Sequence, residues 1–534
     1  MKKRAILYTE NMENLLLLAE FLVSDNWEII SAGETAEFLG YKNIPVTVEK
    51  SLLDSNNDND AYLRLLHQID QTDNKYSYGG LEIAGEIKLV CINILPKFMP
   101  LASFLEESSS ENAIDFKHIS LIRYAAKNYN TTLILTNPED YHEATIQLRT
   151  DNVTKDFKLK LAAKALNLCS AYDASTSLSI MMQEPKIEFP KYFMAPYERN
   201  IKLSHGSNPH QVACLYTENL KSSALNGMKK IQGKELELPI VKNFFSAWNI
   251  VSLFLKIIKN PFEVETIDSS GYAYTTPFTP AAGSVFTIGI KNNNPIGASL
   301  GSNVNHSLSK TFNCAPTIFD GATLGCSAVI DVEAAVTLSK SNLKAIIAPD
   351  FTKDARQILS ENNSIRLVMA SVVSSNFHEI SSIDGGLLVE TADNELFRKW
   401  HIVTQKRPTQ AQIDAMAFGT MVCFASKSYS SLVINDSSAI GISVGQPSRK
   451  RAVNFAIQAA EECLQNGLTS SDTNAEVLVS DTSIPFDERI IKAAELGVKA
   501  IIQTGGTSSD RALIDFCNEH EISMIFTGMH HLSF

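Results

Sequence analysis

Short apolar segments alternate with helix-like patterns through the first third of the chain, and this alternation restricts the fold more than any other feature. The segment RAILYT predicts a buried strand, and NMENLLLLAEFLVSDN after it predicts a helix with leucines on one face. The segment WEIISAGETAEFLGYKN repeats strand, glycine turn and helix, and EIKLVCINILP predicts another strand, bounded by Pro96. Such units in series predict a parallel sheet with helices on both faces, which binds ligands at the carboxyl ends of its strands.

The same alternation returns twice further along the chain, so we predict an α/β protein of several domains. A chain of 534 residues also exceeds what one ordinary core accommodates. A long helical pattern, TKDFKLKLAAKALNLCSAYDASTSLSIMM, closes the first region, and a stretch with three prolines near 184–200 predicts a linker. The predicted domains are 1–185, 200–365 and 366–534.

Composition and charge exclude several classes of protein. Hydrophobic residues make up 44% and charged residues 20%, and the net charge is -12 with no basic tract, so we expect neither nucleic acid nor an anionic membrane as a partner. We see no apolar run of membrane-spanning length, and the N-terminus turns polar too soon for a secretory signal. The eight cysteines are scattered without a C-x-x-C pair, which predicts reduced thiols in a cytoplasmic protein. No metal site is expected, because the adjacent histidines of MHHLSF do not make a ligand set alone.

The stretch GIKNNNPIGAS, Gly289 to Ser299, has two interpretations. Asparagine and Pro-x-Gly favour turns for local backbone reasons, so local chemistry alone predicts an ordinary turn. The alternative is a catalytic loop in which one side chain has changed. Only the remainder of the chain distinguishes the two.

Eleven short motifs, in register over about 500 residues, make the chain resemble the bifunctional purine-biosynthesis family that joins AICAR transformylase to IMP cyclohydrolase. They include SAGETAEFL, LVCINILP, GSNPHQ, KNNNPIG, AIIAPDF, GGLLV, IGISVGQPSR, VSDTSIPF and IIQTGGTSSD. The resemblance implies a methylglyoxal-synthase-like doubly wound domain followed by two cytidine-deaminase-like domains. It also implies a homodimer with transformylase sites across its interface, and 10-formyl-tetrahydrofolate as co-substrate.

The resemblance places the family's catalytic loop at the asparagine run. The family pattern K-H-x-x-P-x-G appears here with Lys291 and with Asn292 in the histidine's place. Asparagine donates a hydrogen bond to an oxyanion but cannot carry a proton near neutral pH. The other changed transformylase positions are Ser204, His205, Lys344, Tyr429, His530 and Phe534. The retained ones are the catalytic candidate His210 and the folate-binding candidates Gly325, Arg449, Pro485 and Phe486.

The resemblance also implies losses in the N-terminal site. The position of the phosphate cradle S-G-G-T contains Glu34. Because the backbone N–H groups of such a cradle favour an anion, the Glu34 carboxylate would take the place of the phosphate. The ring-closing tyrosine is replaced by Leu95. The first-loop lysine is Met12, and the G-G that follows the aspartate is Lys117 and His118. The R-V-K-T-L-H-P lysine is Arg64, His67 is kept, and the proline after it is Gln68. Asp115 and Lys127 remain with Arg64 as the cyclohydrolase remnant.

Each of these residues also has a structural interpretation. Lys291 can be an ordinary loop lysine, and His210 can hold a turn through local hydrogen bonds. Asp115 and Lys127 can form a surface ion pair that contributes little. Arg449 lies before a helix and can satisfy carbonyl or carboxylate groups.

Three functions remain open from the sequence. The chain can be an active enzyme of purine biosynthesis, a formyltransferase for a different amine acceptor without a phosphate, or a catalytically inactive paralogue that binds or assembles with a partner. Losses at both phosphate sites, with partial survival of the reduced-folate side, favour the second. We expect that function to proceed with a weakened or lost cyclohydrolase half.

Overall fold

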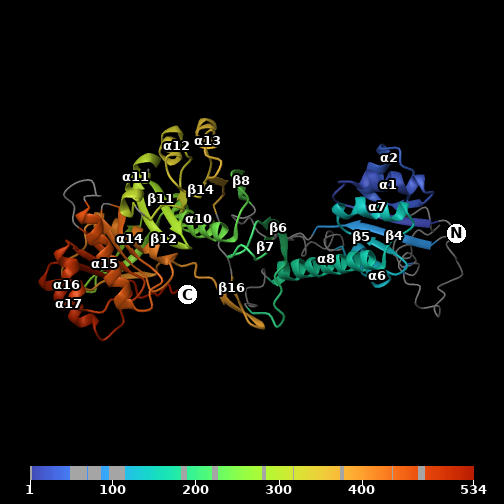
Figure 1. The fold of residues 1–534 in the computed structure, drawn as a ribbon. Helices are drawn as coiled ribbons and strands as arrows, with labels where there is room; N and C mark the ends of the chain where they lie inside the picture. The colour runs from blue at the N-terminus through green and yellow to red at the C-terminus, as the bar shows by residue number, and fades with distance from the viewer. Residues whose placement is uncertain are drawn as a thin grey trace. The chain divides into compact units, whose positions relative to one another are not determined.

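The computed structural model describes residues 3–48, 69, 86–95, 115–181, 189–218, 227–278, 284–316, 318–372, 378–435, 437–466 and 475–533. The chain forms two compact units (Figure 1). One comprises Met1–Glu198 with Tyr216–Lys221, and the other comprises Arg199–Leu215 with Ser222–Phe534. Helices and strands alternate in both units, so the predicted α/β class is confirmed.

The N-terminal unit is a five-stranded parallel sheet with the order β3-β2-β1-β4-β5. Its strands are β1 (Lys3–Thr9), β2 (Glu28–Ser31), β3 (Thr47–Val48), β4 (Glu86–Asn93) and β5 (Leu133–Leu135). Its helices are α1 (Leu15–Ser24), α2 (Gly33–Tyr41), α6 (Phe116–Lys127), α7 (Tyr141–Arg149) and α8 (Lys155–Met181), with the 3-10 turn η2 (Pro138–Asp140). Figure 1 shows α1, α2 and α7 on one face of the sheet and α6 and α8 on the other. Strand positions are therefore buried on both sides, which explains their nearly continuous apolar sequences.

The larger unit contains one mixed sheet of fourteen strands. One half of it has the order β12-β11-β13-β14-β15-β8. Its strands are β8 (Lys229–Gln232), β11 (Val285–Lys291), β12 (Asn294–Gly301), β13 (Thr323–Cys326), β14 (Ala345–Ala348) and β15 (Arg366–Met369). A hairpin, three mutually parallel strands and an antiparallel edge strand follow one another across this half.

The other half repeats this arrangement as β20-β19-β21-β22-β23-β18 and continues into β9 and β10. Its strands are β18 (Lys399–Ile402), β19 (Ser431–Asn435), β20 (Ser438–Ser443), β21 (Val477–Ser480), β22 (Ala500–Gln503), β23 (Ser523–Phe526), β9 (Phe262–Ile267) and β10 (Ala273–Phe278). The halves join where β12 pairs with β20. The predicted boundary at 365/366 lies just before β15, a strand of the first half.

Eight helices and one small ribbon complete the described part of this unit, and a second ribbon, of β6 and β7, contains residues of both units. The helices are α10 (Leu238–Lys259), α11 (Val304–Cys314), α12 (Val332–Ser339), α13 (Lys353–Ser360), α14 (Gln410–Phe424), α15 (Arg449–Gln465), α16 (Glu488–Glu495) and α17 (Asp510–Glu519). The ribbons are β6 (Tyr197–Leu203) with β7 (Ala213–Glu218), and β16 (His378–Ile383) with β17 (Gly386–Thr391).

Helix α10 is long and apolar enough to cross a membrane by length and composition, which our sequence analysis overlooked. It is the one such helix among the described residues, with a mean hydropathy of 1.3 over its most apolar 18-residue window. Interspersed lysines and polar residues hide the pattern in the sequence. Because Phe244, Trp248, Val251 and Phe254 are fully or nearly fully buried in the main core, we interpret α10 as a core helix.

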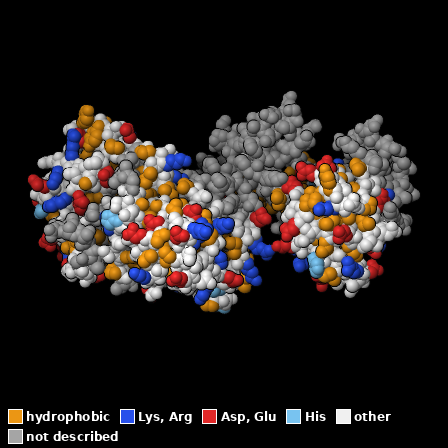
Figure 2. All heavy atoms as spheres, turned by 90° about the horizontal axis from the view of Figure 1, so that it is seen from above, with side chains coloured by type: hydrophobic (Ala, Val, Ile, Leu, Met, Phe, Trp, Pro, Cys, Tyr) orange, Lys and Arg blue, Asp and Glu red, His pale blue; other side chains and the backbone are white. Residues whose placement is uncertain are grey.

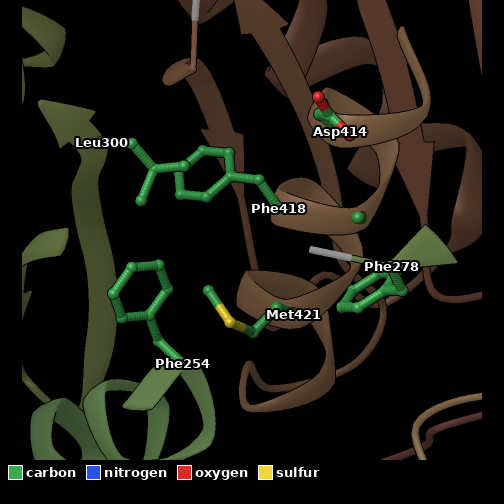
Figure 3. Close-up of a pocket in the computed structure, with 7 residues that line it drawn as sticks. Phe254, Phe278, Leu300, Asp414, Phe418 and Met421 are labelled. Atoms are coloured by element: carbon green, nitrogen blue, oxygen red, sulfur yellow. The ribbon is translucent and has the colours of Figure 1, made fainter. Parts of the chain in front are cut away.

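A small apolar pocket with a cavity volume of about 10 Å³ lies where α10, α14, β10 and β12 meet (Figure 3). The side chains of Phe254, Leu300, Phe418 and Met421 gather around it. The volume falls below the roughly 300–1,000 Å³ of ordinary ligand sites, so we treat the pocket as a packing gap. Asp414 also lines it, and burial raises the pKa of this carboxyl, an effect that the hydrogen bond from Gln410 only partly offsets.

Replacing Asp414 by asparagine is expected to stabilise the larger unit at pH 7. The folded-state pKa of Asp414 lies above its unfolded-state value, so the carboxyl is neutral in acid and its burial then carries no charge penalty. The free energy of unfolding falls as the pH rises through the folded-state pKa. The gain from Asp414→Asn should therefore shrink towards pH 4. Thermal unfolding at both pH values measures it, with the exposed Asp384→Asn as control. An equal gain at both pH values would contradict this account.

Candidate active sites

The asparagine run is a two-residue hairpin turn between β11 and β12. Lys291 pairs with Asn294, and Asn292 and Asn293 have φ angles of 52° and 64°. A hairpin turn with positive φ at both central residues matches the twist of the strands, and asparagine tolerates that conformation. The turn prediction is therefore confirmed, and its assignment to the family's Lys-His loop stays a prediction. The two interpretations of the sequence are compatible.

Helix α10 holds this turn in place. The Asn293 N–H donates to the Asn243 side chain over 2.8 Å, and the Ser246 hydroxyl donates to the Asn293 side-chain oxygen. Asn292 itself is exposed at the tip, and its carbonyl accepts from the Asn294 amide over 3.2 Å. The Asn292 side chain is therefore exposed on a turn that the bonds of Asn293 hold to α10.

The Lys291 ammonium is hydrogen-bonded to the backbone of the protein itself. Its Nζ donates to the carbonyl oxygens of Ile318 at 3.0 Å and Asp320 at 2.7 Å. These bonds tie β11 to the loop before β13, as expected of a loop lysine. A catalytic Lys291 has to exchange them for substrate.

His210 lies exposed in the loop 204–211, which is built on its own hydrogen bonds. The Gly206 N–H donates to the Gln211 carbonyl over 2.8 Å, and the Gln211 side chain accepts from Asn208. The Leu238 N–H at the start of α10 donates to the His205 carbonyl. This loop bonds to Leu238 and the 291–294 turn bonds to Asn243, so both are attached to the N-terminal half of α10. At about 1.5 Å of helical rise per residue, the two attachment points are about 7.5 Å apart along the helix axis.

Three of the four folate-binding candidates lie together in the second half. Arg449 begins α15 and donates from Nη1 to the Ser483 hydroxyl, which places it beside the segment after β21. Pro485 and Phe486 continue that segment half-buried, and the Phe486 ring lies 5.2 Å from the Phe516 ring. Because Arg449 bonds a hydroxyl instead of a carboxylate, its remaining donors are not tied up in an ion pair among the described residues.

Gly325 lies apart from that group, in the interior. A Cβ at this position would lie 3.1–3.2 Å from the side chains of Ala247, Ile288 and Val251. Close packing of β13 against α10 therefore accounts for this glycine, and no direct contact with a folate is needed to explain it. Its role in folate binding stays a prediction.

Asp481, within the motif VSDTSIPF, is a buried carboxyl that our sequence analysis did not single out. It is 5% exposed and accepts hydrogen bonds from the Ser428 hydroxyl at 2.7 Å and the Ser430 N–H at 3.0 Å. Burial raises the pKa of its carboxyl, and these hydrogen bonds oppose that shift. Ser428 also exchanges hydrogen bonds with Ser533, so Asp481 helps to anchor the C-terminal segment. An aspartate directly after an apolar strand was the available signal.

The two histidines of MHHLSF have different surroundings. His530 is exposed, whereas both ring nitrogens of His531 are bonded, to the Asp393 carboxylate at 2.6 Å and the Leu396 carbonyl at 3.0 Å. His531 therefore fastens the C-terminal segment to the loop before β18. Among the described residues, no three His, Cys, Asp or Glu side chains gather in a way that could hold a metal ion.

The segment predicted to correspond to the phosphate cradle forms the start of α2. Glu34 is exposed in the first turn of α2, where the helix dipole stabilises an anion. The Thr35 hydroxyl accepts from the Thr9 N–H over 2.9 Å, joining α2 to the end of β1. Met12 accepts from the Thr9 hydroxyl, and Leu95 is 49% exposed. Arg64, His67 and Gln68 lie outside the described residues.

The proposed ion pair between Asp115 and Lys127 was wrong. Asp115 is the N-cap of α6 and Lys127 is its last residue, so the helix separates them by about 18 Å. Asp115 instead binds His118 through both carboxylate oxygens, and the Lys127 ammonium lies 5.8 Å from the centre of the Tyr124 ring. The structure therefore does not bring these two remnant residues into one site.

Acidic and basic side chains are interspersed on the molecular face in Figure 2. No continuous basic patch is visible on that face. This distribution agrees with the net charge of -12.

Comparisons with known proteins identify one family. The family model of the AICARFT/IMPCHase bienzyme matches residues 125–459. The bifunctional purine biosynthesis protein PurH of Clostridium acetobutylicum is 32% identical over 99% of both chains, and those of Clostridium kluyveri and Clostridium botulinum are 31% identical over 99% of both. The crystal structure of ForH matches 34% of this chain and 98% of its own at 20% identity, with a TM-score of 0.28, and supports no argument. The chain thus belongs to the PurH family of bifunctional AICAR transformylase/IMP cyclohydrolase proteins, whose members are enzymes of purine biosynthesis.

Proposed function

We propose that this chain is a formyltransferase that moves the formyl group of 10-formyl-tetrahydrofolate to a small amine acceptor without a phosphate. The observation that carries the proposal is the change of phosphate-binding positions in both units. Ser204 and His530 stand where the family offers arginines, and Met12 and Glu34 stand in the N-terminal site. Phosphate recognition normally uses arginine forks or unobstructed helix N-termini.

The reduced-folate side supports the same proposal. Arg449, with its hydrogen bond to Ser483, offers a planar donor set for a carboxylate, and Pro485 and Phe486 beside it offer an apolar surface for a flat ring. These groups suit a reduced folate, which would supply the formyl group. In the other half, the exposed Asn292 amide suits donation to the oxyanion of a tetrahedral intermediate.

The proposal includes a cytoplasmic homodimer. The His210 and Lys291 segments are attached to α10, and the Arg449 and Phe486 segment belongs to the other half of the sheet. No hydrogen bond among the described residues joins these two groups. A two-fold partner that brings the first group of one protomer to the second group of another would complete the site.

Formyl transfer to two acceptors that differ only in the phosphate tests the proposal. The full-length chain is supplied with 10-formyl-tetrahydrofolate and either AICAR or its 5′-hydroxyl nucleoside, and the formylated product is quantified by mass spectrometry. A higher kcat/KM for the nucleoside supports the proposal. Preference for AICAR would instead show a purine-biosynthesis enzyme, and turnover of neither would favour the inactive paralogue.

Formyl-AICAR itself is expected to remain unconverted by the N-terminal unit. Glu34 repels the phosphate at the α2 N-terminus, and Met12 stands where the family offers the phosphate a lysine. Ultraviolet absorbance follows IMP formation from synthetic formyl-AICAR, with a PurH relative of intact motifs as the positive control. Turnover well above the uncatalysed rate would refute this prediction.

A further inference from the structure

The N-terminal unit contains an aspartate–histidine pair at the start of α6. Asp115 Oδ2 lies 2.5 Å from His118 Nδ1, and Asp115 Oδ1 accepts from the His118 N–H at 2.9 Å. Burial opposes ionisation of Asp115, but the hydrogen bonds and charge of His118, with Lys117, hold the pKa of the carboxyl below its usual value. In the neutral tautomer whose Nδ1–H donates a hydrogen bond to Asp115, the lone pair of the imidazole lies on Nε2.

Contacts from three elements fix the orientation of the pair. The His118 ring lies against the Tyr8 ring of β1, with centroids 4.5 Å apart. The Asp115 N–H donates to the Tyr172 hydroxyl of α8 over 2.8 Å. The imidazole is therefore held on one side by Asp115 and on one face by Tyr8, and its Nε2 edge has no hydrogen-bond partner among the residues described here.

The pair is placed where ligands bind in this type of fold. Helix α6 follows β4 and precedes β5, so its N-terminus lies at the carboxyl edge of the parallel sheet. Tyr8 is the penultimate residue of β1 at the same edge. The side chains of His118 and Asp115 are 25% and 34% exposed, so a small molecule or water can reach them.

We propose that His118 is a catalytic acid–base residue, that Asp115 is its positioning residue, and that the pair closes the ring of a formylated aminoimidazole carboxamide without a phosphate. This inference rests on the proposed function, because that formyl transfer supplies the substrate. A helix N-cap alone explains the bond from the His118 N–H to Asp115. It does not explain why the second carboxylate oxygen orients an imidazole whose other nitrogen is unpartnered in the described structure.

The proton transfers balance without another reactant. The carboxamide nitrogen forms a bond to the formyl carbon as His118 Nε2 takes its proton, and the formyl oxygen receives a proton to become a hydroxyl. Loss of the formamide N–H proton then forms the C=N bond as the C–O bond breaks. The oxygen leaves as water with two hydrogens from the two nitrogens, and His118 returns to its starting state.

The residues at positions 117 and 118 also agree with a substrate that lacks a phosphate. The chain has Lys117 and His118 where the family has two glycines, so side chains replace an open backbone at the start of α6. His118 supplies an acid–base group on the edge where Leu95 has replaced the tyrosine. The chemistry is thereby retained by a different residue, for a substrate that makes no demand on the altered cradle.

The experiment uses the full-length chain and a chemically formylated 5-aminoimidazole-4-carboxamide nucleoside, with ring closure followed by ultraviolet absorbance. Loss of a general acid–base group costs about 10²–10⁴-fold, so His118→Gln should lower kcat/KM by that factor. The exposed His142→Gln in the same unit is the matched control and should leave the rate unchanged. Unfolding curves of all variants check that the unit is intact.

Two measurements separate catalysis from a structural role. Asp115→Asn removes the carboxylate that orients the imidazole, so it should lower kcat with little change in KM if Asp115 acts through His118. Added imidazole should restore part of the activity of His118→Ala. An unchanged rate in His118→Gln, or an unchanged kcat in a folded Asp115→Asn protein, would overturn the inference.

The preformed substrate makes the two proposals separable. Formyl transfer to the nucleoside without ring closure would overturn the inference and leave the proposed function standing. Ring closure without formyl transfer would overturn the proposed function and leave the role of His118 standing. Absence of both reactions would overturn both.

Discussion

An Asn292→His variant is expected to gain little AICAR transformylase activity, although the wild-type chain should fall about 10²–10⁴-fold below family members with an intact Lys-His loop. That factor is what a missing general acid–base group typically costs. Histidine tolerates the positive φ of position 292, so the turn should survive the substitution. The imidazole alone does not free Lys291 from the carbonyls of Ile318 and Asp320, and it adds no phosphate ligand at Ser204.

Initial rates of formyl transfer from 10-formyl-tetrahydrofolate to AICAR measure this effect. Asn294→His, two residues along the same hairpin, controls for the mere addition of an imidazole near the turn. A gain of about 100-fold or more from Asn292→His alone would mean that only the base was missing. The account of a changed nucleotide pocket would then be wrong.

The fold of the N-terminal unit followed from the sequence because each element is a local pattern. Continuous apolar segments such as RAILYT are long enough to be strands buried on both faces, and the leucines of α1 recur with helical spacing. The arrangement of the larger sheet did not follow in the same way. The strand β9 pairs with β18, more than 130 residues away, and β12 joins β20 through the pair Ser299 and Ser438. No local pattern encodes such long-range pairing.

In the candidate sites, too, the sequence predicts local features but not long-range contacts. The Asn292–Asn293 turn could be predicted, because its residue types match a backbone conformation. The capture of Lys291 by two carbonyls could not, since the loop that supplies them is nearly thirty residues away. The Asp115–His118 contact was available in the sequence DFKH as an N-cap with a partner three residues on. The sequence alone does not show that the imidazole turns back to the second carboxylate oxygen, because the Tyr8 ring that lies against it comes from β1, more than 100 residues away.

The protein is expected to bind a reduced folate more tightly than AICAR. The expected difference in affinity comes from the loss of contacts to the phosphate of AICAR. Each charge-assisted hydrogen bond contributes roughly 1.5–3 kcal/mol, so losing the two arginine positions, now Ser204 and His530, should weaken AICAR by about two to four powers of ten. Ser204 and His530 are both exposed, so burial of these side chains does not replace the lost phosphate interaction. The folate candidates Arg449 and Phe486 are retained and lie together.

Calorimetric titration at moderate salt compares the two ligands, and a charge-restoring variant isolates the cause. Ser204→Arg should raise the affinity for AICAR about 10- to 100-fold, because it returns one such bond, while the affinity for folate stays constant. Ser207→Arg is the matched control, since it adds the same charge at another exposed position of the 204–211 loop. Equal gains from both variants would reduce the effect to general electrostatic attraction. Micromolar binding of AICAR by the unmodified chain, with no detectable folate binding, would reverse the predicted order of affinities and with it the argument that both units have lost phosphate recognition.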